Sequence, residues 1–293
     1  MVFAMERGAE FPFLGYGVGL RRPHYGEVVA ARPAIDWFEV IAENFMVAGG
    51  PALATLGRVR ERYPLVTHGV SLSVGSTDPL NRDYLRDLRH LARRFAPAWL
   101  SDHLCWTGVA GRNLHDLLPL PFTDAAVAHA AGRIRTVQDL LGRRIAIENI
   151  SSYMTYAASS IAEWDFVAAV ANEADCAILL DLNNIYVNAF NHRFDPRRYI
   201  DAIPAERVVQ FHLAGHSDHG AYLLDTHDHP ISAPVWELFE YAVGRIGEVS
   251  TLVEWDDRIP PFAELSAVAD EARRRAHAVV AARKDGAPAG LAQ

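Results

Sequence analysis

Short apolar runs of strand length alternate with longer amphipathic stretches along almost the whole chain, and this alternation occurs eight times. The apolar runs lie at residues 16–20, 37–41, 65–71, 99–104, 144–149, 177–182, 208–213 and 251–254. The stretches with helical periodicity lie at residues 25–31, 51–63, 80–95, 124–141, 161–173, 196–203, 233–246 and 262–283. Alternation of this kind predicts a parallel sheet, and eight units within 293 residues fit a closed (β/α)8 TIM barrel better than an open doubly wound sheet.

The punctuation of the amphipathic stretches is typical of helices. Pro51 and Pro234 suit first-turn positions, Thr123 and Asp124 supply capping side chains, and Gly142 suits a helix end. No linker divides the sequence, so we expect a single barrel domain over residues 1–283. The remaining tail, residues 284–293, is rich in Ala and Gly, and we expect it to be disordered.

Composition and charge exclude several classes of protein. No run approaches the roughly 18 uninterrupted apolar residues of a membrane span. The first residues, MVFAMERGAEFPF, lack the pattern of a signal peptide, so we expect a cytoplasmic protein without membrane contact. Lys and Arg number 28 against 36 Asp and Glu, a net charge of -8 that disfavours nucleic acid as a partner. Because Cys105 and Cys176 are the only cysteines, any bound metal must have nitrogen and oxygen ligands.

Ionisable residues stand at the ends of the predicted strands. In this fold the functional groups gather at the C-terminal ends of the strands. The residues found there are Glu39, Glu43, His68, His103, Glu148, Asp181, His212 and Glu254. Burying so many ionisable groups costs several kcal/mol each unless they pair or hold a cation. The set therefore predicts a metal site.

The loop after the seventh strand, GHSDHGAYLLDTHDHPI, adds further potential ligands. Asp225 and His227 have the i, i+2 spacing that directs two side chains to one face of an extended segment. Three or more histidines with four carboxylates exceed the needs of a single ion, so the count favours a multinuclear site with bridging carboxylates. The ligand types suit Fe, Mn or Zn and disfavour Ca or Mg.

Eight sequence strings, in order and without a large gap over residues 15–257, resemble one known family. They are FEVIAENF, THGVSLSVG, SDHLCW, IENISSY, LLDLNNIYVNAFN, FHLAGH, LDTHDHPI and VEWD. Together they closely resemble the multinuclear non-heme iron-dependent oxidases, the group that includes the methanobactin-biosynthesis oxidase and was long catalogued as an uncharacterised protein family.

The resemblance implies a xylose-isomerase-like barrel holding two or three iron ions, in mixed Fe2+ and Fe3+ states. With dioxygen, such an enzyme oxidises residues of a ribosomally made precursor peptide, most often cysteine. The pattern assigns three residues to the first iron, the last of them bridging: His68, His103 and Glu148. It assigns to the second iron Asp181, His212 and Glu254. It assigns to the third iron Asp225 and His227, with a residue from the loop after the sixth strand.

At one position the chain departs from the pattern. The methanobactin-making member has a histidine three places after the aspartate of the sixth strand, and here Asn184 stands at that place. A neutral amide oxygen is a poorer iron ligand than imidazole. We therefore expect two tightly held irons and a labile third one, with Asn184 as its weak ligand.

Four more residues are expected near the substrate or behind the ligands: Glu43, Asn44, His216 and Arg21. No acid or base separate from the metals is assigned. Members of the family commonly act with a small, separate protein that recognises the precursor. Because nothing in this chain resembles an appended peptide-recognition domain, we expect such a partner, besides a cysteine-containing peptide.

Two other kinds of protein remain open at this point. Sugar isomerases or epimerases and abasic-site endonucleases resemble the same barrel and also use His and carboxylate clusters, although the acidic balance disfavours the endonuclease. A sugar isomerase differs from an oxidase in needing no dioxygen. A non-catalytic metal-binding protein would saturate its coordination positions, whereas a catalytic site keeps one open.

Overall fold

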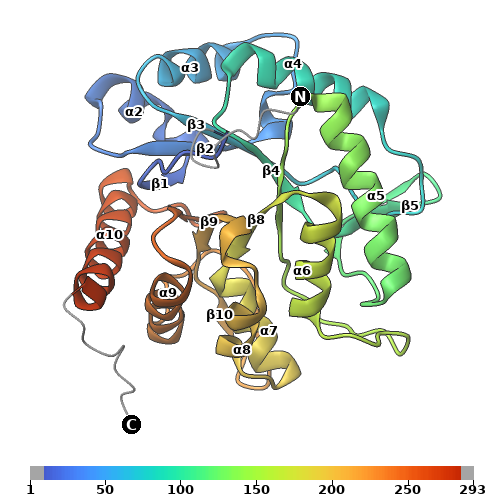
Figure 1. Cartoon of the computed structure of the whole chain (residues 1–293). Coiled ribbons are helices and arrows are strands. Elements are labelled where there is room, and N and C mark those ends of the chain that lie inside the picture. The colour runs from blue at the N-terminus through green and yellow to red at the C-terminus, as the bar shows by residue number, and fades with distance from the viewer. Residues whose placement is uncertain (1–9, 285–293) are drawn as a thin grey trace.

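The computed structural model describes residues 10–284, which form a closed barrel of parallel strands with helices outside it (Figure 1). The barrel strands are β1 (Tyr16–Gly19), β2 (Trp37–Ile41), β3 (Leu65–Gly69), β4 (Leu100–His103), β7 (Ala146–Glu148), β8 (Ala177–Asp181), β9 (Val208–Leu213) and β12 (Ser250–Val253). They are hydrogen-bonded in the order β1-β12-β9-β8-β7-β4-β3-β2, and β1 pairs with β2 to close the barrel. The predicted TIM barrel is confirmed. Residues 285–293 of the expected tail lie outside the described residues.

The predicted helices are all present among the described residues, together with α7, which was not predicted. They are α2 (Tyr25–Ala31), α3 (Pro51–Arg60), α4 (Arg82–Phe95), α5 (Asp124–Leu141), α6 (Glu163–Ala174), α7 (Leu182–His192), α8 (Pro196–Ala202), α9 (Ala233–Ile246) and α10 (Phe262–Lys284). The Thr123 hydroxyl accepts a hydrogen bond from the Ala126 N–H at the start of α5, and Gly142 ends this helix at φ 71°. Pro51 and Pro234 lie in the first turns of α3 and α9.

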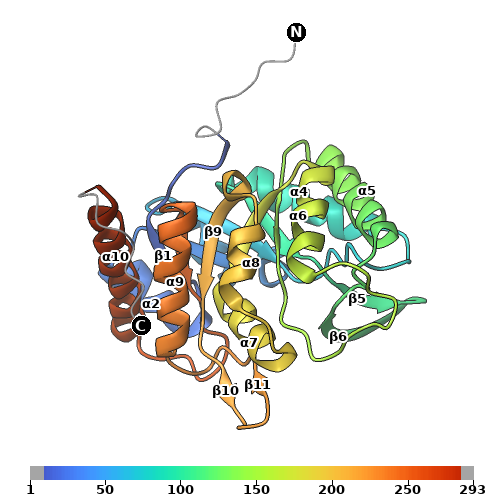
Figure 2. The ribbon, with the colours of Figure 1, turned by 60° about the horizontal axis from the view of Figure 1, so that its bottom comes forward.

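One helix and two hairpins were not predicted, and several predicted strands extend one or two residues beyond the observed ones. Leu182, at the end of one predicted apolar run, begins α7, a helix that the pattern did not reveal. Two antiparallel hairpins also extend from the barrel, β5 (Trp106–Val109) with β6 (Arg112–Leu118) and β10 (Ser217–Asp218) with β11 (Leu223–Leu224). Figure 2 shows both hairpins at the lower side of the barrel, beyond the C-terminal ends of the strands.

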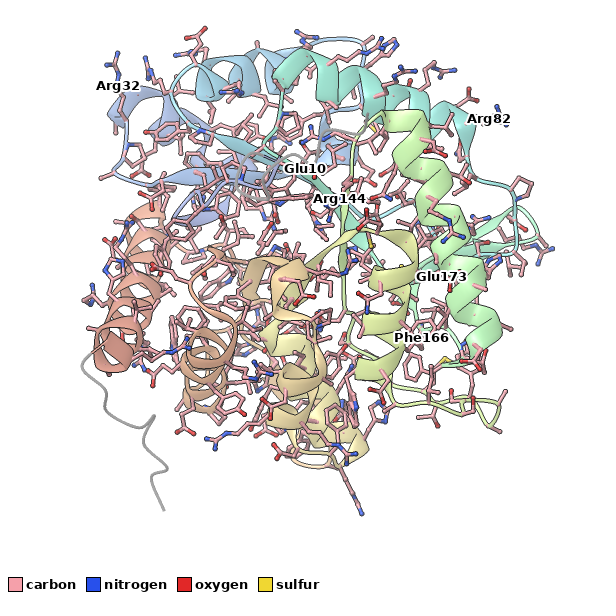
Figure 3. All side chains as sticks on the ribbon, viewed as in Figure 1. Glu10, Arg32, Arg82, Arg144, Phe166 and Glu173 are labelled. Atoms are coloured by element: carbon pink, nitrogen blue, oxygen red, sulfur yellow. The ribbon has the colours of Figure 1, made fainter. Side chains whose placement is uncertain are left out.

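The N-terminal end of the barrel is filled and sealed. Trp37, Val66, Trp99 and Leu252 form an apolar cluster there with no exposed surface. The segment that leads into β1 crosses this end, where Glu10 pairs with Arg144 at 3.3 Å (Figure 3). With this end closed, polar side chains inside the barrel can reach solvent only at the opposite end.

Candidate metal centre

Six ionisable side chains from six neighbouring strands converge inside the C-terminal mouth of the barrel. They belong to His68, His103, Glu148, Asp181, His212 and Glu254, and all are buried. Their ligand atoms form two groups able to hold an ion, and both groups contain Glu148. The six predicted ligands are thus brought together by the alternation of side chains along strands that run side by side.

The first group consists of His68, His103 and Glu148. The Oε2 atom of Glu148 lies 3.1 Å from Nε2 of His68 and 3.2 Å from Nε2 of His103. The two Nε2 atoms are 3.3 Å apart. Nδ1 of His103 lies 3.1 Å from the Gly69 carbonyl, which can only accept, so this nitrogen carries the proton. The lone pair of His103 Nε2 is therefore directed toward Glu148 and His68.

Close packing behind His103 requires a glycine at position 69. A Cβ built on Gly69 would lie 2.4 Å from Oδ2 of Asp102 and 2.8 Å from the Tyr84 hydroxyl. The Asp102 carboxylate accepts the backbone N–H groups of His103 and Leu72. A side chain at position 69 would displace the strand that sets the orientation of His103.

The second group surrounds Nδ1 of His212. This nitrogen lies 3.1 Å from Glu254 Oε2, 3.3 Å from Glu148 Oε1 and 3.9 Å from Asp181 Oδ2. Glu148 therefore uses one oxygen for each group, which is the geometry of a bridging carboxylate. No other described residue occurs in both of these groups.

The opposite edge of the His212 ring faces a second carboxylate. Nε2 of His212 lies 3.2 Å from Oε1 of Glu39, and the Gln210 amide donates to Oε2 of Glu39 at 2.7 Å. The Trp99 indole N–H donates to the Gln210 oxygen at 2.7 Å, which turns the amide nitrogen toward Glu39. The Gln210 amide nitrogen also lies 2.8 Å from Nε2 of His212, so Glu39 and Gln210 together orient the ring and turn Nδ1 toward the second group, as the residues behind metal-binding histidines commonly do.

Asp181 serves a helix and the site at once. Its Oδ1 accepts the N–H of Asn184 at 2.6 Å and caps α7, while Oδ2 faces the second group. The Asn184 amide donates to the Asn149 carbonyl at 3.1 Å, which leaves Asn184 Oδ1 as a buried acceptor without a hydrogen-bond partner. Asn184, which replaces the histidine of the family pattern, therefore still offers an oxygen as a possible metal ligand.

Asp225 and His227 lie together, as predicted, with Nε2 of His227 2.6 Å from Oδ1 of Asp225. Nδ1 of His227 lies 3.1 Å from Oδ2 of Asp256, and Arg21 forms an ion pair with the same Asp256 carboxylate. His227 has a left-handed backbone with φ 48°, which is uncommon for a residue other than glycine. His227, Glu254 and Asp256 also form a group able to hold an ion.

The loop that carries Asp225 and His227 closes at its base. The His227 N–H donates to the Gly215 carbonyl at 3.1 Å. A Cβ on Gly215 would lie only 1.9 Å from the carbonyl oxygen of His229, so the two ends of the loop cross in backbone contact. This contact fixes where the loop leaves and rejoins the barrel.

The charges in the mouth shift the pKa values of the buried groups in opposite directions. Burial raises the pKa of Glu148, but His103, His212 and His68 more than offset this, so that its pKa lies well below the usual range. Burial raises the pKa of Asp181 well above the usual range, and the Glu148 charge adds to this effect. Burial lowers the pKa of His68, but the charge of Glu148, the hydrogen bond to Glu148 and the charge of Glu39 together outweigh burial and raise this pKa to about 9. In the metal-free protein, protons on Asp181 and His68 therefore offset negative charge that bound cations would otherwise offset.

The orphaned polar atoms test whether a metal fits. Among the described residues, ten buried side-chain atoms have no hydrogen-bond partner, and five of them belong to predicted ligands: Oε2 of Glu148, Oδ2 of Asp181, Oδ1 of Asn184, Nδ1 of His212 and Nε2 of His227. The other five belong to His24, Glu43, Arg133, Ser232 and Trp255. Leaving a buried polar atom unsatisfied costs about 1–3 kcal/mol, and a cation removes that cost for all the atoms it contacts. The residues present fit metal ions with nitrogen and oxygen ligands.

The four other candidates have different surroundings. Glu43 lies behind the site, where its carboxylate accepts from the Val70 N–H and the Tyr84 hydroxyl. Asn44 is exposed and makes no side-chain hydrogen bond with the described residues. Arg21 lies beside the site and pairs with Asp256 and Glu254. His216 bonds to Asn183, which in turn bonds to Asp225.

The sequence analysis missed several residues that contact the ligands. Ser101 lies 2.8 Å from Nδ1 of His68, and Ser151 donates to Asp225 at 3.0 Å. Gln210 and Asp256 were missed as well. Ser101 and Gln210 each lie two residues before a histidine ligand in the same strand, so period-two alternation could have identified them.

Comparison with known proteins shows the family of this chain. A family model described as RiPP precursor modification enzyme MbnB/TglH/ChrH, for ribosomally made and modified peptides, matches residues 15–277. The chain belongs to this family. A UPF0276 protein of Anaeromyxobacter sp. strain Fw109-5 is 54% identical over 269 residues, covering 92% of this chain and 94% of the relative. A UPF0276 protein of Caulobacter vibrioides is 52% identical over 265 residues, covering 90% and 95%.

Solved structures share the fold at low sequence identity. A xylose isomerase domain protein from Alicyclobacillus acidocaldarius gives a TM-score of 0.56 at 14% identity, covering 92% of this chain and 99% of that one. Endonuclease IV from Thermus thermophilus gives 0.58 at 16% identity, covering 90% and 99%. These likenesses confirm the xylose-isomerase-like barrel. Among the described residues, no helix is both long and apolar enough to cross a membrane.

Proposed function

We propose that this member of the RiPP-modifying family is a multinuclear iron- and dioxygen-dependent oxidase that modifies cysteine residues of a precursor peptide. The observation that carries the proposal is Glu148, whose two oxygens face two separate groups of ligand atoms. One carboxylate shared between two nitrogen-containing groups is suited to a pair of neighbouring ions. A site for a single metal ion does not need a shared carboxylate.

In this proposal the mouth would hold two or three irons. His68, His103 and Glu148 would hold the first. Glu148, Asp181, His212 and Glu254 would hold the second. Asp225 and His227, with the orphaned oxygen of Asn184, would hold a third more weakly. When bound, iron supplies the redox chemistry with dioxygen that no side chain here can perform.

The protein's own residues orient the ligands and exclude water. Glu39 and Gln210 orient the His212 ring, and the Gly69 carbonyl holds the proton of His103 on Nδ1. The side chains of His212 and Glu148 have 0% and 2% of their surface exposed, whereas those of His103 and Asp225 have 10% and 13%. The site is therefore dry at its base and accessible at its rim, where a peptide can enter.

We also propose that a separate partner protein recognises the peptide. Within residues 10–284 the chain consists of the barrel, its helices and two short hairpins, and contains no further module. A precursor much longer than the residue to be modified needs binding surface elsewhere. A partner protein would provide that surface and deliver the cysteine to the mouth.

The test is to incubate the iron(II)-loaded protein, its partner and the precursor peptide with dioxygen and to weigh the peptide. We expect a mass change confined to a cysteine-containing fragment, and none without dioxygen or with His103→Ala. His90→Ala is the control, since this exposed helix residue is outside the mouth. Anaerobic turnover, or modification that survives replacement of every peptide cysteine by serine, would refute the proposed chemistry. Anaerobic turnover of a sugar would indicate a sugar isomerase instead. Only the fold supports that alternative.

A further inference from the structure

His216 lies at the mouth of the barrel, beside the third candidate site but outside its ligand set. It follows β9 by three residues, and its ring packs on Tyr186 with centroids 5.3 Å apart. A chain of two hydrogen bonds joins it to Asp225 through the side-chain amide of Asn183. Each of these bonds is 2.7 Å long.

The order of this chain fixes which nitrogen of His216 carries the proton. The Asp225 carboxylate is an acceptor, so the amide nitrogen of Asn183 faces Asp225 and donates to Oδ1. The amide oxygen of Asn183 must then face His216 and accept from Nδ1. A neutral His216 therefore holds its proton on Nδ1 and its lone pair on Nε2.

The ring is neutral near pH 7 and its Nε2 is free. Burial lowers the pKa of His216, and the charges around it belong to Asp225, Asp218, His229 and His227. Among residues 10–284, Nε2 makes no hydrogen bond or ion pair. The side chain is half-buried, so small molecules and peptides have access to it.

We propose that His216 is the proton acceptor for the substrate thiol, a role that rests on the proposed cysteine oxidation. A thiol must lose its proton to become a metal ligand. In the proposed step the S–H bond breaks, the proton moves to Nε2, and the electron pair stays on sulfur for donation to the cation. The resulting imidazolium keeps its Nδ1–H bond to Asn183, so the step breaks no contact of the loop.

The variant His216→Asn separates this role from a structural one. The Asn amide nitrogen can occupy the position of Nδ1 and still donate to Asn183, but nothing replaces Nε2. A structural residue would tolerate this change and a proton acceptor would not. His219→Asn is the matched control, because His219 lies on the same hairpin, is exposed and stacks only on Tyr222.

The experiment measures the rate of thiol binding rather than turnover. Cobalt(II)-loaded full-length protein is mixed with N-acetylcysteine amide at pH 7 in a stopped-flow spectrometer, and the absorption of the cobalt–thiolate bond is followed. We expect His216→Asn to bind the thiol about 100-fold more slowly than the wild type and His219→Asn, and added imidazole to restore part of the rate. Nitrogen-15 NMR of the histidine-labelled protein should show the Nδ1–H tautomer for the signal that His216→Asn removes.

Three results would overturn the role of His216. They are an Nε2–H tautomer, equal rates of thiol binding by the wild type and His216→Asn, and a cobalt protein that binds no thiol at all. These readouts need neither iron nor dioxygen. A protein that fails the peptide assay but shows the slower thiol binding of His216→Asn would refute the proposed function and leave the proton acceptor in place. The reverse result would refute only this inference.

Discussion

Single atoms decide the chemistry of this mouth. The two oxygens of Glu148 face different ligand groups, and the two oxygens of Asp181 face a helix N-terminus and a ligand group. In each case one side chain satisfies two demands that a shorter or neutral residue could not. The following predictions therefore change one functional group at a time.

Replacing Glu148 by Gln should remove more than one equivalent of metal per chain. The amide keeps one oxygen and exchanges the other for a donor, so it cannot bridge two cations. The measurement is metal content after reconstitution with iron(II) under anaerobic conditions. Glu163→Gln is the control, since Glu163 is a half-buried carboxylate that bonds to Asn188 and Tyr199 and contacts no ligand. Loss of a single equivalent would contradict the bridge while leaving the cluster intact.

Replacing Asn184 by His should raise the occupancy of the weakest site. Imidazole is a better ligand for iron than an amide oxygen, and Asn184 Oδ1 already lies buried without a partner. Titration with iron(II), followed by metal analysis, measures the change. The exposed residue Asn44 provides the control variant, Asn44→His. If both variants bind the same amount of iron as the wild type, Asn184 does not face the third ion.

Glu163 should make the metal-free protein less stable at alkaline pH. Burial raises its pKa to about 7, from an ordinary value of 4.5. The folded state then binds more protons than the unfolded state between these two values, so stability falls as pH rises through that window. Glu163→Gln cannot ionise and should gain up to about 3 kcal/mol over the wild type at pH 8.

Urea unfolding in the presence of a chelator at pH 4 and pH 8 measures this difference. The two proteins should have similar stability at pH 4, where Glu163 is protonated in both states. Glu61→Gln, a change at an exposed site, should show no such dependence. A gain for Glu163→Gln that is the same at both pH values would mean that packing, and not ionisation, is responsible.

At the scale of elements, helix α7 joins the fold to the site. The alternation of strands predicted the barrel and its ligand positions, because period-two patterns place alternate side chains inside. The contacts behind the ligands could not be predicted in this way. Glu39 and His212 are 173 residues apart in sequence and meet only when the barrel closes. Helix α7 was missed because four of the eleven residues in its sequence, LNNIYVNAFNH, are asparagine, which has a low helix propensity.

Two changes at Asp181 should separate the helix from the metal. Asp181→Asn keeps an oxygen for the Asn184 N–H, whereas Asp181→Ala removes the cap and should cost the metal-free protein about 1 kcal/mol more. Both should lose metal. Asp195→Ala removes the cap of α8 and should lower stability without any loss of metal. Chemical unfolding and metal analysis of the three variants give the comparison, and normal metal content in Asp181→Asn would remove this residue from the ligand set.

At the scale of the whole molecule, shape and charge point to different partners. The fold is similar to that of an endonuclease, with a TM-score of 0.58, but the net charge of this chain is -8. A phosphate backbone carries a dense negative charge and binds proteins mainly through Lys and Arg. Similar barrels can therefore host chemistry on unrelated substrates.

Duplex DNA, with or without an abasic site, should not bind appreciably at physiological salt. The physical reason is the net repulsion between the acidic protein and the phosphates. Fluorescence anisotropy with a labelled duplex is the measurement, and the Thermus thermophilus endonuclease IV is the positive control. Sub-micromolar binding that weakens with added salt would restore the endonuclease alternative.

The crossing of Gly215 and His229 has a consequence for how such enzymes can diversify. The crossing holds the base of the loop, and the pairing of Ser217 with Leu224 and of Asp218 with Leu223 separates the tip around Gly220 from Asp225 and His227. Residues inserted at that tip would lengthen the reach of the hairpin and leave the ligand positions where they are. Any side chain at position 215 would instead force the two ends apart. Variation in length is therefore compatible with the ligands at the tip, and position 215 must stay glycine.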